Sequence, residues 1–279
     1  MGRMPDHVMA HELDLVWQQI FTWVSWGIVV AMLVIAVRMG LRQRTPFYVL
    51  AIVAACVAAF AEPLYDVAFD LWFYDVHNGE PGAMWSHFSA FGVVQPNWSH
   101  SGYVILYASA CLYAGRAMYE GRLGRRGLFG IWLAEIAASC LFEVIGTATV
   151  YTYYGPYELR LGNYPLVIGV LEGTQVILFT VLAVQIRKRV ETAWGLTALL
   201  AAFPITFFGA NFGIGAPVII ALHTDPPHFS SGLVWAATLV TMALCVVAVN
   251  GASKFLPRSD AADETGGEPA RRALEPADA

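Results

Sequence analysis

Long apolar runs separated by short polar segments dominate this chain. Because a bilayer core requires about 20 apolar residues per helix, the pattern predicts membrane-spanning helices. The seven predicted spans are roughly residues 16–38, 46–68, 99–119, 127–150, 164–186, 194–221 and 230–250. We expect residues 1–253 to form a single all-α, seven-helix membrane domain. The polar residues 254–279 are predicted to be a disordered cytoplasmic tail.

Composition and charge support this reading and orient the helices. Hydrophobic residues make up 57% of the chain and charged residues only 13%. Arg and Lys follow the first, third, fifth and seventh predicted spans, whereas the alternate loops hold only Arg160 and the N-terminal segment only Arg3. Since cytoplasmic loops carry the excess of Arg and Lys, we expect the N-terminus outside and the C-terminus inside. The protein is predicted to be a multi-pass protein of the cell membrane.

The segment between the second and third predicted spans is rich in aromatic residues. It reads LWFYDVHNGEPGAMWSHFSAFGVVQPNW over residues 71–98, which is too apolar for a solvated linker. We expect this outer loop to fold back over the helix ends as a short re-entrant or interfacial helix. All the histidines and most tyrosines fall on the same outer side, which favours a pocket mouth in addition to an interfacial aromatic belt.

Acidic residues inside the spans are the main functional candidates. An ionisable side chain in lipid costs about 2.5–3.5 kcal/mol, so it normally faces the bundle interior. In the second and fourth spans polar residues recur every four positions, which places each set on one stripe of a helix. These residues are Glu62, Asp66 and Asp70 in the second span and Glu135, Ser139 and Glu143 in the fourth.

The fifth span adds Glu172 and Gln175, and the sixth adds Asn211 near its outer end. Apart from Glu135, which lies deeper, these polar residues share the outer half of the membrane. We therefore expect one polar pocket enclosed by the second to sixth spans.

Structural roles compete with this interpretation. Glu62 can serve as a hydrogen-bonding residue that only holds helices together, Asp66 can lie at the wet boundary, and Glu135 can be a structural partner near the inner side. Gly209 and Gly213 have the GxxxG spacing that is typical of close helix packing, within the chain or between two copies.

The stretch AEPLYD, Ala61 to Asp66, combines two acids with a proline. A proline cannot donate to the carbonyl four residues earlier, here that of Ala59, and it kinks a helix. The freed carbonyl needs another partner in lipid. We expect the second span to bend where Glu62 and Asp66 project.

Several function classes are disfavoured by the residues present. Metal-dependent prenyl-diphosphate chemistry requires acid clusters such as DDxxD or NDxxDxxxD, and neither occurs. Retinal binding requires a lysine in the last span, which has none, and no GxSxG motif is found. Only His7 and His11 are spaced i, i+4, and they precede the first span. We therefore expect no metal and no cofactor.

The remaining possibility is acid chemistry in an apolar, aromatic-lined chamber. Burial disfavours the charged form of a carboxyl, which can then stay protonated and act as a general acid. Such an acid can protonate an alkene or epoxide, and aromatic faces can stabilise the resulting carbocation. We expect Glu62, Asp66, Glu143 and Glu172 to be catalytic. Glu62 is the candidate donor, and Asp66 is expected to orient it or replenish its proton.

The chain resembles the small seven-helix integral-membrane terpene cyclases, which comprise fungal meroterpenoid cyclases and bacterial indole-sesquiterpene cyclases of the drimentine type. The resemblance rests on size, the number of spans, the AEPLYD acids and the further acids in the fourth and fifth spans. It implies metal-independent, proton-initiated cyclisation of a prenyl chain on an indole-derived unit. Glu62 is the position that it carries over. The fungal pattern also has a late aspartate, whereas the last two spans here contain no acid.

The expected partners are a lipid-soluble prenylated small molecule and membrane lipids, with no nucleic acid. Alternatives are a proton-coupled transporter of a hydrophobic small molecule, a sterol-isomerase-like enzyme, and a binding or sensor protein. The residues expected to bind the substrate are Tyr65, Phe69, Trp85, Trp98, His100, Tyr103, Tyr151, Gln175 and Asn211.

Overall fold

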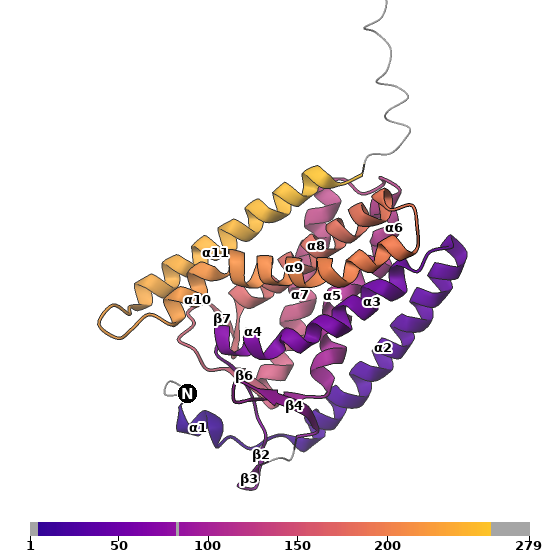
Figure 1. Cartoon of the computed structure of the whole chain (residues 1–279). Helices are drawn as coiled ribbons and strands as arrows, with labels where there is room; N and C mark the ends of the chain where they lie inside the picture. Colours follow the sequence, from indigo (N-terminus) through magenta and orange to yellow (C-terminus); the bar gives the residue numbers. More distant parts are fainter. Residues whose placement is uncertain (1–4, 82–83, 258–279) are drawn as a thin grey trace, which may run out of the picture.

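The computed structural model describes residues 5–81 and 84–257, which are mostly helical (Figure 1). Six helices or unbroken helical runs in this part of the chain are long and apolar enough to cross a membrane. They are α2 (Leu15–Gln43), Phe47–Ala68, α7 (Arg125–Thr149), α8 (Leu166–Arg189), Trp194–Ile214 and Ser231–Phe255. The protein is therefore a helical, membrane-embedded protein.

Three of these runs contain more than one element. The first comprises α3 (Phe47–Ala58), the 3-10 turn η1 (Ala59–Ala61) and α4 (Glu62–Ala68). The second comprises η2 (Trp194–Ala198), α9 (Leu199–Phe208) and the π-helix η3 (Gly209–Ile214), and α10 (Ala216–Leu222) follows it. The last comprises α11 (Ser231–Ala252) and η4 (Ser253–Phe255).

The third predicted span, residues 99–119, differs from the other six. It consists of α5 (Trp98–Tyr113) and α6 (Gly115–Tyr119), which are separated at Ala114. Neither piece alone reaches the length of a spanning helix. The tail predicted to be disordered lies outside the described residues from position 258 onward, and its first residues form the end of η4.

α8 lies at the centre of the bundle. Five helices pack against it: α5, α6, α7, α9 and α11. Of the residues in its most apolar 18-residue stretch, 89% are buried, compared with 28% in the corresponding stretch of α7. Glycines bring α7 unusually close to this central helix. A Cβ at Gly173 would lie 2.8 Å from Ile136 Cγ1 and 3.4 Å from the Trp132 carbonyl oxygen, and a Cβ at Gly169 would lie 3.1 Å from Cys140 Sγ. Small residues permit this kind of approach between membrane helices.

The GxxxG spacing of Gly209 and Gly213 does not pack helices together within the described structure. A Cβ at Gly209 would meet nothing within 4 Å, and one at Gly213 would meet only the Phe208 carbonyl oxygen at 3.8 Å. Both glycines lie in η3, whose wider turn moves them off the i, i+4 face of an α-helix. Close helix packing within the chain is found instead at Gly169 and Gly173.

The break expected near Pro63 is present. The α-helical turn gives way to η1 immediately before α4, and the backbone N–H of Glu62 donates to the Ala59 carbonyl. Pro63 has no N–H to donate to the Ala59 carbonyl. That carbonyl is instead satisfied by the hydrogen bond from Glu62, three residues later. The hydrogen-bonding pattern of the helix thus changes immediately before Glu62.

The prediction of a re-entrant or interfacial helix within residues 71–98 was wrong, because this segment forms β-strands. β2 (Val76–His77) pairs with β3 (Glu80–Pro81), and β4 (Ser86–Ala90) pairs with β5 (Val93–Pro96). Asn78 and Gly79, and likewise Phe91 and Gly92, have positive φ, as two-residue hairpin turns require. The Asn78–Gly79 pair is a sequence typical of a two-residue hairpin turn.

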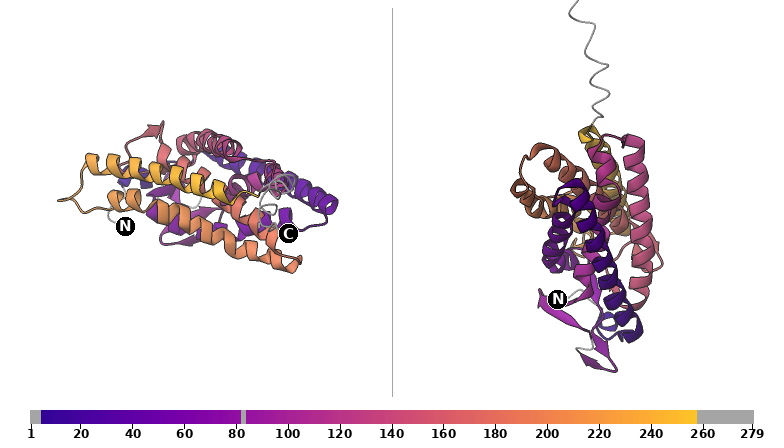
Figure 2. Two further views of the ribbon diagram at one scale, coloured as in Figure 1. Left: turned by 90° about the horizontal axis from the view of Figure 1, so that it is seen from above. Right: turned by 90° about the vertical axis from the view of Figure 1, so that its right-hand side faces the viewer.

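There are two further strand pairs, and the first of them joins segments that are far apart in the sequence. β1 (Leu71–Phe73) pairs antiparallel with β6 (Tyr151–Tyr153), which follows α7, and β7 (Arg160–Leu161) pairs with β8 (Tyr164–Pro165). The hairpins lie at the end of the molecule that also holds α1 (Asp6–Met9), whereas the last turn of α11 lies at the opposite end (Figure 2). The segment after α4 thus covers one end of the helical bundle.

Replacing Gly173 by Ala is expected to destabilise the protein by about 1–3 kcal/mol, because the new methyl group must displace Ile136 or separate α7 from α8. Thermal unfolding in detergent measures the effect. Gly130→Ala is the matched control on α7, since a Cβ there meets nothing within 4 Å. Equal melting temperatures for the two variants would contradict the close packing of α7 and α8.

Candidate active site

A cavity of about 430 Å³ lies between α4, α5, α7 and α8, next to the β1–β6 ribbon. This volume is within the range of small-molecule sites. Most of the lining is apolar or aromatic, and four carboxyl side chains interrupt it: Glu62 of α4, Glu135 and Glu143 of α7, and Glu172 of α8. All four are at least nine-tenths buried. Glu135, Ser139 and Glu143, which are spaced four residues apart on α7, thus face one cavity. Glu62 and Glu172 face it from α4 and α8.

Glu172 is held by hydroxyl donors. The Tyr65 hydroxyl donates to Oε1 at 3.3 Å, and the Tyr164 hydroxyl donates to Oε2 at 2.9 Å. The Ser139 hydroxyl also donates to Oε2. Hydrogen bonds of this kind stabilise negative charge on the acceptor and fix its orientation. Glu172 is therefore a rigid acceptor at the centre of the bundle.

Glu62 has a different environment. Among the described residues, no side chain donates to it a hydrogen bond of standard geometry. The Tyr103 hydroxyl lies close to Glu62, is buried and has no hydrogen-bond partner in the described structure. Glu172 is close enough to Glu62 for the two carboxyls to interact electrostatically. Glu62 is thus a carboxyl in the cavity wall without the donors that hold Glu172.

Glu143 faces the tyrosines of β6. Its Oε2 is buried without a partner in the described structure, and the Tyr151 and Tyr153 hydroxyls lie nearby. Burial raises the pKa of both phenols well above the usual range, and the neighbouring Glu143 adds to this effect, so they stay neutral. Gly146 makes room for this arrangement, because a Cβ there would lie 2.3 Å from the Tyr151 hydroxyl oxygen.

The β1–β6 ribbon closes this end of the cavity. Leu71 pairs with Tyr153 and Phe73 pairs with Tyr151, and all four side chains line the cavity. Residues at alternate positions of a strand point to the same face, which is why these four point inward together. The Trp98 indole lies 5.5 Å from the Phe73 ring and 5.8 Å from the Tyr151 ring, between centroids, and extends this aromatic surface.

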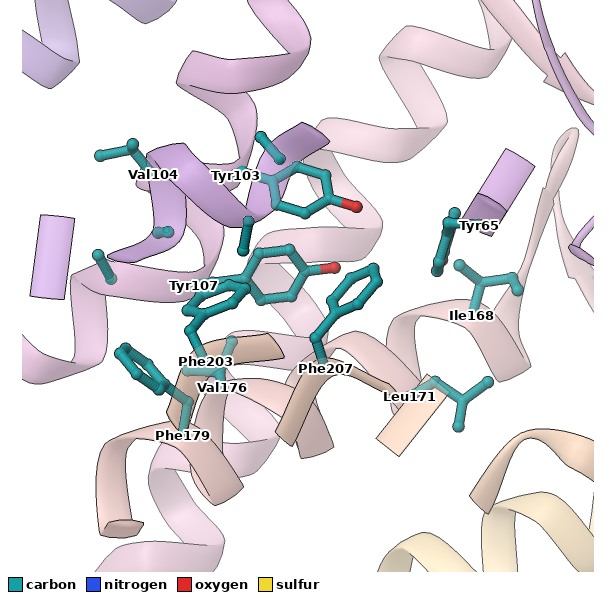
Figure 3. Close-up of a cluster of buried hydrophobic side chains, with 14 of the residues drawn as sticks. Tyr65, Tyr103, Val104, Tyr107, Ile168, Leu171, Val176, Phe179, Phe203 and Phe207 are labelled. Carbon is teal, nitrogen blue, oxygen red and sulfur yellow. The ribbon is translucent and has the colours of Figure 1, made fainter. Parts of the chain in front are cut away.

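Tyr103 and Tyr107 of α5 form a second aromatic wall of the cavity, and rings of α9 pack against them. The Tyr103 and Tyr107 rings lie side by side at 5.1 Å between centroids, and their hydroxyls point the same way, toward the side on which Tyr65 lies (Figure 3). Phe207 packs against Tyr65, Tyr103 and Tyr107 at 5.6–6.1 Å between centroids. The Phe203 ring packs edge-on against Tyr107 at 5.7 Å between centroids, and both residues are labelled in Figure 3. Aromatic faces of this kind are attractive to a cationic group.

Asp66 and Asp70 do not line the cavity, although they follow Glu62 at helical spacing. Asp66 is fully buried and accepts a hydrogen bond of 2.5 Å from Gln95 of β5, which ties the β4–β5 hairpin to α4. Asp70 lies beyond the end of α4 in a left-handed conformation, with φ of 51°, and its Oδ1 lies 3.5 Å from His223 Nε2. Of the three acids predicted to share one face of this span, only Glu62 therefore lines the cavity.

The predicted substrate-binding residues divide into two groups. Tyr65, Trp98, Tyr103 and Tyr151 line the cavity, whereas Phe69, Trp85, His100, Gln175 and Asn211 do not. Each residue of the second group has another place in the structure. Phe69 packs on Tyr65, half-exposed Trp85 lies against Trp23, and His100 lies 3.0 Å from His87, between ring nitrogens.

The two amides of the second group also point elsewhere. Gln175 donates to the Thr206 hydroxyl, and Asn211 donates to the Phe207 carbonyl one turn earlier in its own helix. These contacts join α8 to α9 and support the start of η3. They give both amides structural surroundings outside the cavity.

Four lining residues were missed as site residues: Glu135, Ser139, Tyr107 and Tyr153. Tyr164 was also missed; it does not line the cavity but donates to Glu172. Glu135 and Ser139 share the α7 stripe with Glu143, and that spacing was sufficient to select them. Tyr107 lies one turn after Tyr103 on α5. Tyr153 is brought in by strand pairing with β1, which no local pattern in the sequence indicates.

The chain has no detectable match among protein-family models, curated proteins or solved structures. Within residues 5–81 and 84–257, no group of three or more His, Cys, Asp or Glu side chains is arranged to hold a metal ion.

Replacing Gln95 by Leu is expected to lower stability by about 1–3 kcal/mol, because it leaves the buried Asp66 carboxyl without its donor. The double variant Asp66→Leu/Gln95→Leu is expected to recover part of that loss, since both polar partners are gone. Unfolding in mixed detergents measures both effects. Ser89→Ala, at an exposed position of the same hairpin, is the control. Additive losses in the double variant would show that Asp66 and Gln95 are not coupled.

Proposed function

We propose that this protein is a metal-independent terpene cyclase that protonates an alkene or epoxide of a prenylated, indole-derived substrate within the membrane. Three acids support this most directly: Glu62, Glu143 and Glu172 come from three helices and meet in one buried cavity walled by aromatic rings. The buried Tyr103 and Tyr151 hydroxyls lie beside Glu62 and Glu143 and add polar groups to the same wall.

The different surroundings of the acids suggest a division of roles. Glu62 accepts no standard hydrogen bond from the described residues and is the proton donor in our proposal. Glu172, held by three hydroxyls, is the fixed negative group that stabilises the cation. Glu143, which faces neutral tyrosines, is the candidate for removing the final proton. Carboxyls placed in contrasting environments commonly take contrasting acid and base roles.

The proposed reaction is an isomerisation. The O–H bond of the Glu62 carboxylic acid breaks as a C–H bond forms at the alkene, which leaves a carboxylate and a carbocation. The next alkene of the chain supplies its π electrons to form a carbon–carbon bond and moves the positive charge along the chain. A carboxylate then removes a proton from the last cation. No net proton, electron or leaving group is exchanged over the cycle, and proton return to Glu62 restores the enzyme.

We further propose that α5 and α6 together form a seventh crossing, with the N-terminus and hairpins outside and the Arg-rich end in the cytoplasm of a cell membrane. α5 packs against α2, α3 and α8, so it lies inside the bundle with helices that are long enough to cross. Arg116 lies in α6 and Arg122 follows it. α8 ends with Arg187, Lys188 and Arg189, which also fits the expected inner side.

Membranes containing the protein are expected to convert a 3-farnesylindole to a cyclised isomer of unchanged mass, with activity retained in EDTA. In D₂O each product molecule is expected to gain one deuterium, because the first step transfers an exchangeable carboxyl proton to carbon. Mass spectrometry measures both results. A requirement for magnesium, or a product without deuterium, would contradict proton-initiated chemistry. Accumulation of unchanged substrate inside sealed vesicles would instead favour the transporter.

Glu62→Gln keeps the size of the side chain and removes the acid, so we expect product formation to fall by at least about 100-fold. Glu120→Gln is the matched control, because Glu120 lies in the Arg116–Glu120–Arg122 surface cluster away from the cavity. Both variants are compared at equal amounts of folded protein. Full activity of Glu62→Gln would show that another group donates the proton.

A further inference from the structure

The cavity continues between α5 and α7 beyond the acids used in the proposed reaction. α5 and α7 both pack along α8 and touch each other only briefly. The space between them is bordered by residues of both helices: Ile105, Leu106, Ser109 and Tyr113 of α5, and Ala134, Glu135, Ala138 and Phe142 of α7. The cavity is therefore elongated, and its far part lies between two helices that α8 holds apart.

This far part is next to the membrane-facing surface of the bundle. Tyr113 is 57% exposed, and Leu133 and Leu141 of α7 are exposed on the outside of the same helix. Large apolar side chains exposed on a spanning helix are suited to contact with lipid. This position near lipid suits a ligand that is dissolved in the bilayer.

One carboxyl group lies in this far part of the cavity. Glu135 is 5% exposed, and its Oε1 accepts hydrogen bonds from Tyr113 and from Ser109, the latter at 3.4 Å. Its Oε2 accepts none from the described residues. Eight residues separate Glu135 from Glu143 on α7, which corresponds to about 12 Å along the helix axis. Apolar and small side chains, including Leu106 and Ala138, lie in the same lining.

We propose that Glu135, with Tyr113 and Ser109, forms a second polar subsite that binds the hydrogen-bond-donating head of an amphiphilic substrate, such as an indole N–H. The prenyl tail then extends along the apolar part of the cavity toward Glu62, Glu143 and Glu172. The substrate thus enters tail first, and its distal alkene or epoxide meets the acids. This inference rests on the proposed function, because it assigns the orientation of the same substrate.

The chemistry of the subsite follows from its donors and acceptors. Tyr113 and Ser109 orient the carboxyl through one oxygen, which leaves the other oxygen available to a ligand. A carboxyl oxygen accepts an N–H or O–H hydrogen bond, and it offers nothing favourable to an N-methyl group at the same position. Discrimination between these two heads is therefore the property that separates a binding role from a purely structural one.

The test measures binding of two unreactive ligands to the full-length protein in detergent. These are a 3-alkylindole with a saturated C15 chain and its N-methyl counterpart, neither of which has an alkene in the chain to protonate. The unmodified protein is expected to bind the N–H ligand about 10-fold or more tightly than the N-methyl ligand. Glu135→Leu is expected to remove this preference by weakening binding of the N–H ligand alone. Glu120→Gln is expected to retain it.

Glu135→Gln keeps the shape of the side chain and is the variant to use where Glu135→Leu does not fold. It is expected to reduce the N–H preference at least threefold, because an uncharged amide is a weaker acceptor than a carboxylate. An unchanged preference in the folded Glu135 variants, or no preference in the unmodified protein, would overturn the subsite. If the protein prefers the N–H ligand but cyclises no substrate, the subsite is supported and the proposed reaction is contradicted. If it cyclises the substrate without preferring the N–H ligand, the proposed reaction is supported and the subsite is contradicted.

Discussion

The close approach of α7 to α8 is the contact on which the rest of the site depends. Gly169 and Gly173 remove side chains from the face of α8 that meets α7, so the two helices can lie near each other around Glu172. At that separation Ser139 of α7 reaches the Glu172 carboxyl, and Glu143 enters the same cavity one turn further on. A bilayer gives little hydrophobic driving force between helices, so close packing and interhelical hydrogen bonds must hold this pair together.

The same contact explains why the cavity lies where it does. α8 is in the middle of the bundle, and α5 and α7 both pack against it. Because α5 and α7 have few contacts with each other, the space between these two helices stays open for a ligand. The β1–β6 ribbon covers one end, and aromatic rings from α5 and α9 support the sides (Figure 3). The polar groups therefore meet in an apolar enclosure whose shape is set by helix packing.

Local pattern was sufficient for part of this structure. Hydropathy located six of the spans, and helical spacing directed Glu143 and Glu172 inward. The same rule misplaced Asp66 and Asp70, because it assumes a continuous helix with nothing packed on its end. α4 ends before Asp70, and the β4–β5 hairpin supplies Gln95 to Asp66. Those contacts depend on the tertiary position of a hairpin, which the order of apolar and polar residues does not specify.

The pairing of β1 with β6 has a consequence for how this protein is made. Leu71–Phe73 and Tyr151–Tyr153 lie 80 positions apart, and two spanning segments are synthesised between them in our topology. When the ribosome has completed α4, Glu62 has neither Tyr103 beside it nor α8 behind it. Its carboxyl must then face lipid, water or the insertion machinery until α5 to α8 have been added. Assembly of the chamber is therefore a late event in biogenesis, and residues that shield Glu62 only in the finished bundle do nothing to assist insertion of α4.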